Sequence, residues 1–525
     1  MAYDSAAQLS YFGREFYTVF STQDNSTDSL TLRLYLHTMK HAEALVEVPA
    51  LGFSTNVSVV PNDITVVTLP ADAFLDEYGK VLSGMAVHVT ATTDIAVLGH
   101  NSKQFSADAF IVYPKTVLGN KYFVLSWENS HFTQNFGEAR SLCTVVATED
   151  GTTVSIHPST ALSDTTLVNA VSMNAGDALA IGSDPFYFGG DLTGSMVTSN
   201  KPIAVFGGHE RAEVPAGFIT PGTNSTSRDH LYEQMLPTAL LGDTVIAVPN
   251  IGKGFVTPQS MRILATEDST AIMFDEQSLL LETAGDYFFR DSLNAPCIFT
   301  ATKRIVGAQY MHCASGASQD PSLALILPTN LYGHNYSFIC IPDPLYTSHM
   351  FTITIRASDP LVKLNGAIIP KLAFRQISGS AFSIGGLSIP EGLHTIVSND
   401  PMNIVVSGTG EVISYAYTLA FGSDPVMAVT SHQPLPSKNG KFSAGFNAES
   451  KLTLRTSDLH PTYIQATVYD ALGRELFAIN QTIALHTGET YCTDYIREVH
   501  PSYLLIQEYD TFGQPAGHPV FLPIP

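Results

Sequence analysis

The chain has 525 residues, too many for one hydrophobic core, and this length predicts three to five domains of ordinary size. Hydrophobic residues make up 45% and charged residues 14% of the sequence, a globular composition that argues against disorder. The formal net charge of −22 would repel nucleic-acid phosphates, so nucleic acid is not expected as a partner.

No apolar run approaches the ~20 residues that a membrane helix needs, so we expect no insertion into a membrane. The first residues, Met-Ala-Tyr-Asp-Ser, lack the basic and apolar regions of a secretory signal. Two interpretations stay open: the protein is not exported by that route, or a signal has been removed. Cysteine pairing is open in the same way, because Cys297 and Cys313 suit either a bridge between neighbouring strands or buried free thiols.

Strict alternation of apolar and polar residues is the dominant pattern along the chain. It is clearest at residues 30–37, 85–90 and 351–356, where apolar side chains would lie on one face of a strand. Long stretches of helical periodicity are hard to find, and turn signals recur at short intervals. The sequence therefore predicts an all-β fold built from sandwiches or barrels.

A polar turn followed by an apolar strand recurs at a domain-sized interval. The copies lie at residues 91–99, 199–207 and 301–309, with a degenerate fourth at 398–408. After each of the first three strands come S-x-D and then Pro with Gly five residues later, starting from Pro114, Pro237 and Pro328. Copies that need the same backbone geometry predict about four tandem β-sandwich-like modules of ~100 residues each.

The recurrences also suggest where the modules begin and end. We place them at residues 12–126, 127–249, 250–342 and 343–424, the second with a long insertion loop and the fourth degenerate. Pro, Ser, Lys and Gly at 432–441 indicate a linker. The alternating segments around it and beyond predict a small C-terminal β-sandwich at 430–525.

Several segments have the character of a known family. They include T-D-I-A-V-L-G-H-N-S from Thr93, K-P-I-A-V-F-G-G-H from Lys201 and R-D-H-L-Y-E-Q-M-L-P from Arg228. Over about residues 12–422 the chain resembles the IgGFc-binding protein N-terminal domain family, a module of secreted mucin-associated animal proteins and bacterial surface proteins. This resemblance implies an extracellular or surface-displayed binding protein.

The chain departs from that family at one place. Many members carry cysteines where this sequence has His209, Glu210, Arg211 and Ser227, so the disulfide that the family implies there is absent. Binding to immunoglobulin Fc does not transfer, because no set of Fc-contacting residues can be carried over. At the other end of the chain, V-Y-D-A-L-G-R-E-L at 468–476 is similar to the β-sandwich sorting domains of bacterial type IX secretion cargo.

One polar cluster in and beside the 207–227 loop is the candidate binding site, because long loops on rigid sheets often carry binding. Its members are His209, Glu210, Arg211, Asp229, His230 and Glu233. Two imidazoles and two carboxylates would suit zinc or another first-row ion if they converge. The alternative is a hydrogen-bonded loop in which Arg211 or Arg228 pairs with Glu233 or Asp229.

The recurring S-x-D segments have two interpretations. Their carboxylates would either contact calcium or a ligand, or cap backbone N–H groups of the turn after each strand. Repetition in every module favours the structural role. The residues concerned are Ser106, Asp108, Ser227, Asp229, Ser318 and Asp320. The T-E-D turns at 148–150 and 266–268 leave the same choice between calcium and a turn.

No catalytic, phosphate-binding or EF-hand motif is present, so no catalytic residue and no cofactor are expected. The first hypothesis is a non-catalytic extracellular or cell-surface protein that binds a glycoprotein, mucus or an envelope partner. The second is a structural component of a particle or filament, such as a bacterial appendage or phage fibre, which would form homo-oligomers. The third is a metal-dependent hydrolase that uses His209 and His230.

Overall fold

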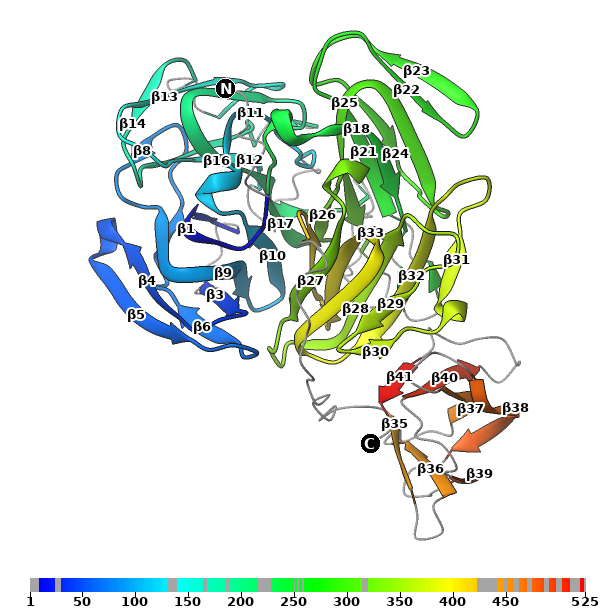
Figure 1. The fold of residues 1–525 in the computed structure, drawn as a ribbon. Helices are drawn as coiled ribbons and strands as arrows, with labels where there is room; N and C mark the ends of the chain where they lie inside the picture. The colour runs from blue at the N-terminus through cyan, green and yellow to red at the C-terminus, as the bar shows by residue number, and fades with distance from the viewer. Residues whose placement is uncertain are drawn as a thin grey trace, which may run out of the picture.

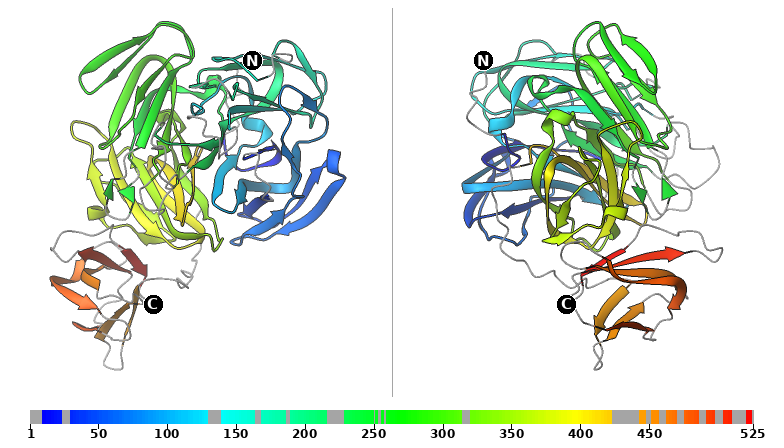
Figure 2. Two further views of the ribbon diagram at one scale, coloured as in Figure 1. Left: turned by 180° about the vertical axis from the view of Figure 1, so that it is seen from behind. Right: turned by 45° about the vertical axis from the view of Figure 1, so that its right-hand side comes forward.

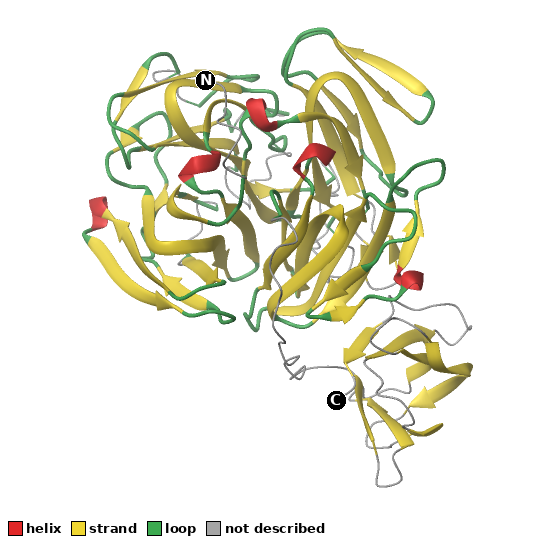
Figure 3. Ribbon diagram, viewed as in Figure 1, coloured by secondary structure: helices red, strands yellow, loops and turns green. Residues whose placement is uncertain are grey.

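The structure is a computed structural model. It describes residues 9–23, 30–129, 139–163, 168–185, 189–215, 228–249, 259–313 and 320–422, and elsewhere the backbone of short strands. Strands dominate these residues, and the helices among them are 3-10 turns of three residues each (Figure 3). The prediction of an all-β fold is therefore confirmed.

Four sheets repeat one strand order, which confirms the prediction of repeated β modules. The orders are β5-β4-β9-β3-β6, β14-β13-β16-β12-β15, β23-β22-β25-β21-β24 and β30-β29-β33-β28-β32. In each sheet one long strand also pairs with the first and the last strand of its module, so the sheet curls around that strand. We number these modules 1 to 4 in chain order.

The strands of modules 1 and 2 have the following bounds. Module 1 contains β1 (Gly13–Thr18), β2 (Phe20–Ser21), β3 (Thr31–Thr38), β4 (Ala42–Val48), β5 (Phe53–Val59), β6 (Thr65–Thr68), β7 (Phe74–Leu75), β9 (Val87–Lys103) and β10 (Ser106–Val112). Module 2 contains β11 (Gly119–Phe123), β12 (Ser141–Ala147), β13 (Thr152–His157), β14 (Val171–Met173), β15 (Ala178–Gly182), β16 (Met196–Ala212) and β17 (Asp229–Gln234), and β8 (Val81–Leu82) joins its sheet.

Modules 3 and 4 follow the same plan. Module 3 contains β18 (Gly242–Ala247), β19 (Ile251–Gly252), β20 (Phe255–Val256), β21 (Gln259–Ala265), β22 (Thr270–Phe274), β23 (Gln277–Leu281), β24 (Tyr287–Arg290), β25 (Cys297–Met311) and β26 (Leu323–Ile326). Module 4 contains β27 (Gly333–Cys340), β28 (Tyr346–Ile355), β29 (Val362–Leu364), β30 (Ala367–Ile368), β31 (Phe374–Gln376), β32 (Ser383–Ile389), β33 (Gly392–Gly410) and β34 (Ile413–Leu419). The 3-10 turns are η1 (Pro49–Leu51), η2 (Lys115–Val117), η3 (Thr238–Leu240), η4 (Thr329–Leu331) and η5 (Lys371–Ala373).

Equivalent hydrogen bonds recur at the T-E-D turns of modules 2 and 3. The Asp150 carboxylate accepts the backbone N–H of Ala175 at 3.1 Å, and the Asp268 carboxylate accepts that of Ala284 at 2.8 Å. Both bonds tie the turn to the next turn of the same sheet. Such bonds match the turn role, which the sequence left open beside calcium binding for these residues.

Strand pairing places the start of each later module slightly earlier than expected. The first strands β11, β18 and β27 begin at Gly119, Gly242 and Gly333, whereas the expected starts were 127, 250 and 343. In each case the strand that follows the Pro-to-Gly segment pairs with the long strand of the next sheet. As limits of independent folding units, the expected boundaries stay predictions.

The four modules surround a common centre (Figures 1 and 2). The last strand of each module lies there: β10 contacts β17 and β34, and β26 contacts the same two strands. A continuous cluster of buried apolar side chains extends through all four modules, and module 3 has a further cluster of its own. The modules therefore form a closed ring rather than a linear row.

The ring closes between modules 1 and 4, which are not consecutive in the chain. The hydroxyl of Tyr11 donates to the Ser337 carbonyl at 3.0 Å and accepts the Ser337 N–H at 2.8 Å. Arg33 forms an ion pair with Asp343 at 2.6 Å. Side-chain and backbone contacts such as these hold the two modules together.

The C-terminal strands form two groups that lie beside the ring in Figure 1. One group has the order β35-β36-β39, and the other has the order β41-β40-β37-β38. Their bounds are β35 (Phe442–Phe446), β36 (Lys451–Thr456), β37 (Thr462–Tyr469), β38 (Glu475–Leu485), β39 (Tyr491–Ile496), β40 (Tyr503–Tyr509) and β41 (Val520–Pro523). Within the described residues, no helix has the length and apolarity needed to cross a membrane.

Candidate functional site

The carboxylate of Asp108 lies at the centre of the ring, and its side chain is fully buried on β10. It accepts backbone N–H groups from Tyr232 of module 2 at 3.0 Å and Ala416 of module 4 at 3.3 Å. Leu323 of module 3 also donates its N–H, and Ala109 donates from the same strand at 2.9 Å. One side chain of module 1 therefore contacts the backbone of all three other modules.

Asp229 has the corresponding role on β17. It accepts the N–H of Ala107 from module 1 at 2.6 Å and that of Ser414 from module 4 at 3.1 Å. The Ser414 hydroxyl in turn accepts the N–H of Asp320 at 3.0 Å. Buried aspartates thus connect modules across the centre of the ring.

Burial governs the protonation of these carboxyl groups. It raises the pKa of Asp108 well above its usual value, and the four backbone N–H donors offset part of that rise. Burial and the nearby Asp320 raise the pKa of Asp229 well above its usual value. Burial also raises the pKa of Asp320 to about 7, with the positive charge of Arg211 acting in the opposite direction.

Four of the six residues predicted for the S-x-D turns lie in the described part of the chain: Ser106, Asp108, Asp229 and Asp320. Ser227 and Ser318 lie outside it. The Ser106 hydroxyl accepts the N–H of His230 at 3.2 Å, so this serine also acts between modules. The local-turn role stays a prediction; the structure adds bonds that cross from one module to another.

The side chains of the two candidate histidines bind different groups. Nδ1 of His209 accepts the N–H of Arg211 at 3.0 Å, and burial, reinforced by the Arg228 charge, lowers the pKa of His209 to about 3. Nδ1 of His230 donates to the carbonyl of His209 at 3.0 Å. Nε2 of His230 lies 3.3 Å from the side-chain amide of Asn101, in module 1. His230 therefore belongs to the contact between modules 1 and 2.

The two candidate glutamates lie in different surroundings. Glu210 accepts a hydrogen bond from the Tyr78 hydroxyl. Glu233 is buried and accepts backbone N–H groups of Thr418 and Gln234, and burial raises its pKa well above the usual value. Among the described residues, no three His, Cys, Asp or Glu side chains come together in a group suited to a metal ion.

Of the six candidate binding residues, only Arg211 has more than a small exposed fraction. His209, Asp229 and His230 are 0% exposed, and Glu233 and Glu210 are 2% and 4% exposed. Several of these buried side chains already form hydrogen bonds that join modules. As a ligand-binding set, these residues stay a prediction.

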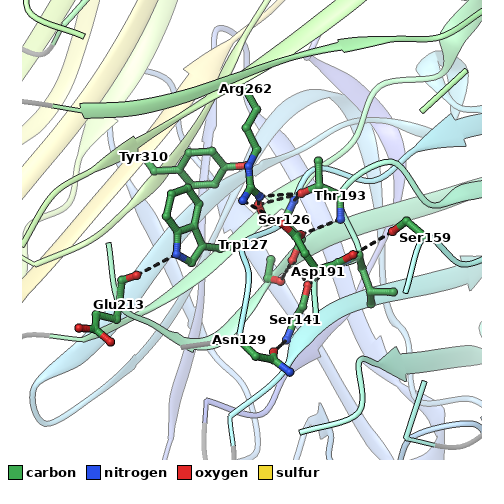
Figure 4. A network of polar contacts seen from close by, with 12 residues as sticks. Ser126, Trp127, Asn129, Ser141, Ser159, Asp191, Thr193, Glu213, Arg262 and Tyr310 are labelled. Atoms are coloured by element: carbon green, nitrogen blue, oxygen red, sulfur yellow. Dashed lines mark hydrogen bonds and ion pairs between the residues drawn. The ribbon is translucent and has the colours of Figure 1, made fainter. Parts of the chain in front are cut away.

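A second polar network, which no sequence pattern indicated, lies between modules 2 and 3 (Figure 4). Arg262, on β21 of module 3, is 3% exposed and contacts Asp191 of module 2 at 2.8 Å. Its Nη1 also donates to the Ser126 carbonyl at 2.5 Å and the Thr193 hydroxyl at 2.8 Å. A module 3 cation is therefore held by three oxygen groups of module 2.

Aromatic rings surround the same guanidinium. Its carbon lies 4.4 Å from the ring centroid of Trp127, 5.1 Å from that of Tyr287 and 5.3 Å from that of Tyr310. Rings at these distances attract a buried cation. Despite burial, the negative charge of Asp191 keeps the pKa of Arg262 above its usual value, so the side chain stays charged.

Two further hydrogen bonds fix the rings. Trp127 Nε1 donates to the Glu213 carbonyl at 2.8 Å, and the Tyr310 hydroxyl donates to the Ser126 carbonyl at 2.6 Å (Figure 4). Trp127 is the single tryptophan of the chain. That uniqueness was the one available signal, since no spacing pattern connects Trp127 with Arg262.

Two comparisons with known proteins, one with family models and one with curated proteins, agree on one family. The family model described as IgGFc binding protein matches residues 108–408. The human IgGFc-binding protein is 26% identical over 90% of this chain, and the chain spans only 9% of that relative. A solved structure of the BSP domain of a biofilm associated protein covers 81% of this chain and 100% of its own, with 8% identity. Its TM-score of 0.13 is too low to support any argument.

Proposed function

The chain belongs to the IgGFc-binding protein family, and from this premise we propose that it is a non-catalytic extracellular or surface-displayed protein that binds a protein or glycoprotein. The observation that supports this most is the ring itself. Four modules held around one centre form a rigid scaffold, and loops on rigid scaffolds are the usual position of binding residues.

The buried polar side chains fit a scaffold. Asp108, Asp229 and Arg262 all make polar contacts with groups of neighbouring modules. Such bonds fix the modules relative to one another and so preorganise the surface that they carry. Preorganisation favours binding because less conformational entropy is lost when the partner docks.

Charge suggests the chemistry of the partner. A chain with a net charge of −22 attracts basic protein surfaces at long range. We therefore expect the partner to present Lys or Arg at the contact, and we expect association to slow as salt is added. The name of the human relative makes the Fc fragment of immunoglobulin G one natural probe.

The test is a binding measurement with the purified full chain immobilised on a sensor. The probes are purified immunoglobulin G Fc, purified mucin and an extract of mucus glycoproteins, and an inert β-sandwich protein on a second sensor is the control. We expect saturable binding of at least one probe, with an association rate that falls as salt rises. Binding of every probe at the level of the control would contradict the proposal.

A further inference from the structure

The outermost strand of module 3 exposes large apolar side chains. β23 is at the edge of its sheet, where only β22 pairs with it, and the hairpin of these two strands extends from the ring (Figures 1 and 2). Leu280 is 54% exposed, the highest value for a large apolar side chain among the described residues. Leu279 and Met273 on the same hairpin are 40% and 45% exposed.

The equivalent strands of the other modules provide an internal comparison. β5 of module 1 exposes Ser54, Asn56 and Ser58, and β14 of module 2 exposes Ser172. β30 of module 4 is two residues long and neither is fully exposed. Polar side chains and short strands are the usual protection of a sheet edge against pairing with another chain. β23 lacks this protection.

Backbone groups of β23 are also oriented for pairing. Ala271 of β22 lies opposite Leu280, and its N–H donates to the Thr302 hydroxyl of β25 at 3.0 Å, so it points away from β23. Backbone groups point alternately to the two sides of an antiparallel strand. Phe274 and Gln277 flank a two-residue turn with positive φ at both positions, so they form a hydrogen-bonded pair. Leu279 and Leu281 therefore face β22, whereas Ser278 and Leu280 direct their N–H and C=O groups outward.

We propose that β23 pairs antiparallel with β23 of a second copy of this chain, around a two-fold axis at Leu280. In this register Leu280 lies opposite its own counterpart, and Leu279 lies opposite Leu281 of the second copy. The outward N–H and C=O groups of Leu280 then exchange hydrogen bonds with those of its counterpart. The contact is self-complementary, as a two-fold dimer requires.

Charge selects this register. With the axis at Leu280, Glu282 faces Ser278 of the second copy and Gln277 faces Thr283, so no carboxylate faces a carboxylate. An axis at Leu279 also pairs outward groups with outward groups, but it would place Glu276 opposite Glu282. Like charges directly opposite each other destabilise paired strands. The partner that places leucine against leucine along this edge is thus β23 of a second copy.

The proposed contact is small, so we expect a weak dimer that dissociates on dilution. The net charge of −22 on each copy opposes association, and salt should therefore strengthen it. This salt dependence is opposite to that expected for the proposed basic partner. Salt dependence therefore distinguishes failure of the proposed dimer from failure of the proposed binding function.

The first experiment measures molar mass by light scattering up to about 100 μM, where a weak complex is populated. We expect the unmodified chain to dimerise and Leu280→Lys to stay monomeric. Ser278→Pro should also stay monomeric, because the N–H that it removes points away from β22 and the hairpin is kept. The matched control is Asn56→Lys on the edge strand β5, which should dimerise like the unmodified chain.

The second experiment tests the register by oxidation of single cysteine variants. Opposed residues at the axis would have Cα atoms about 5.5 Å apart, close enough for a disulfide. Leu280→Cys should therefore form a reducible covalent dimer, whereas Ser278→Cys, which faces Glu282, should not exceed the unmodified chain. A monomer at every concentration, or equal crosslinking of both variants, would overturn the proposal.

Discussion

Arg262 carries the clearest energetic consequence of any single residue, because it is buried, charged and shared between two modules. We expect Arg262→Met to lower the free energy of unfolding by about 3 to 5 kcal/mol, the usual cost of leaving one partner of a buried ion pair alone. Asp191 would then lie beside apolar rings without its cation. Denaturation in urea, followed by Trp127 fluorescence, measures the change.

A double variant separates the ion pair from the packing of the side chain. Adding Asp191→Asn to Arg262→Met removes the stranded charge, so the double variant should be more stable than the sum of the single losses predicts. Strictly additive losses would show that the ion pair contributes nothing of its own. Lys80→Met is a suitable control for the loss of a cation, because its ion pair with Glu77 is at the surface.

Asp108 shows what the sequence could and could not reveal about single residues. Its recurrence with Asp229 and Asp320 was visible, and a structural role for the repeated aspartate was the favoured interpretation. The donors were not visible, because Tyr232 and Ala416 are far away in the chain. A carboxylate that binds N–H groups of other modules leaves the same local pattern as one that caps its own turn.

At the scale of the element, glycines and prolines of the Pro-to-Gly segments make close contacts where a module begins and ends. A Cβ added to Gly119 would lie 2.6 Å from Cβ of Pro237, and the same contact recurs between Gly13 and Pro114. The glycine starts the first strand of a module and the proline follows the last strand of that module. Modules 1 and 2 are therefore each closed by a proline ring that lies too close to the glycine to leave room for a Cβ.

We expect Gly119→Ala to destabilise the protein by about 2 kcal/mol, because an extra methyl group at a packed contact forces the chain apart. The neighbouring substitution Asn120→Ala is the control: its side chain is exposed, and the expected change is within about 0.5 kcal/mol. Urea denaturation midpoints give both values. Equal midpoints for the two variants would show that the contact can relax without cost.

The same segments show where strand pairing of a later module begins. The sequence marked Gly119 and Gly333 only as the ends of a repeated motif. Both begin strands that pair with the long strand of the following sheet. Pairing between strands that are distant in the chain has no local signature, so the motif was visible but its place at the start of a module was not.

For the whole molecule, the sequence predicted modules but not their ring. Alternation and repeats are local properties, and they indicated both the all-β class and the number of copies. Closure depends on contacts between modules 1 and 4, including the bond of 2.8 Å between His100 Nε2 and the Tyr346 hydroxyl. These residues come from unrelated parts of the repeat and share no pattern.

Closure of the ring makes the molecule sensitive to acid. His37 is buried in module 1 beside Phe12 and close to the backbone of Ser337 in module 4, and burial lowers its pKa from 6.5 to about 4. Unfolded chains bind a proton at this position below pH 6.5, whereas the folded protein does so only near pH 4. The unfolded state therefore gains protons first, and stability falls as the pH decreases between these values.

We expect this one group to cost the unmodified protein about 2 kcal/mol of unfolding free energy between pH 7 and pH 5. His37→Phe keeps an aromatic ring in the site without a titratable group, so its loss over the same interval should be smaller by about that amount. Buried carboxyl groups with raised pKa, such as Asp229, titrate in both proteins and cancel in the comparison. Urea denaturation at the two pH values measures the difference, with the exposed His157→Gln as control. If His37→Phe and the unmodified protein lose equal stability, the seam between modules 1 and 4 does not respond to protonation of His37.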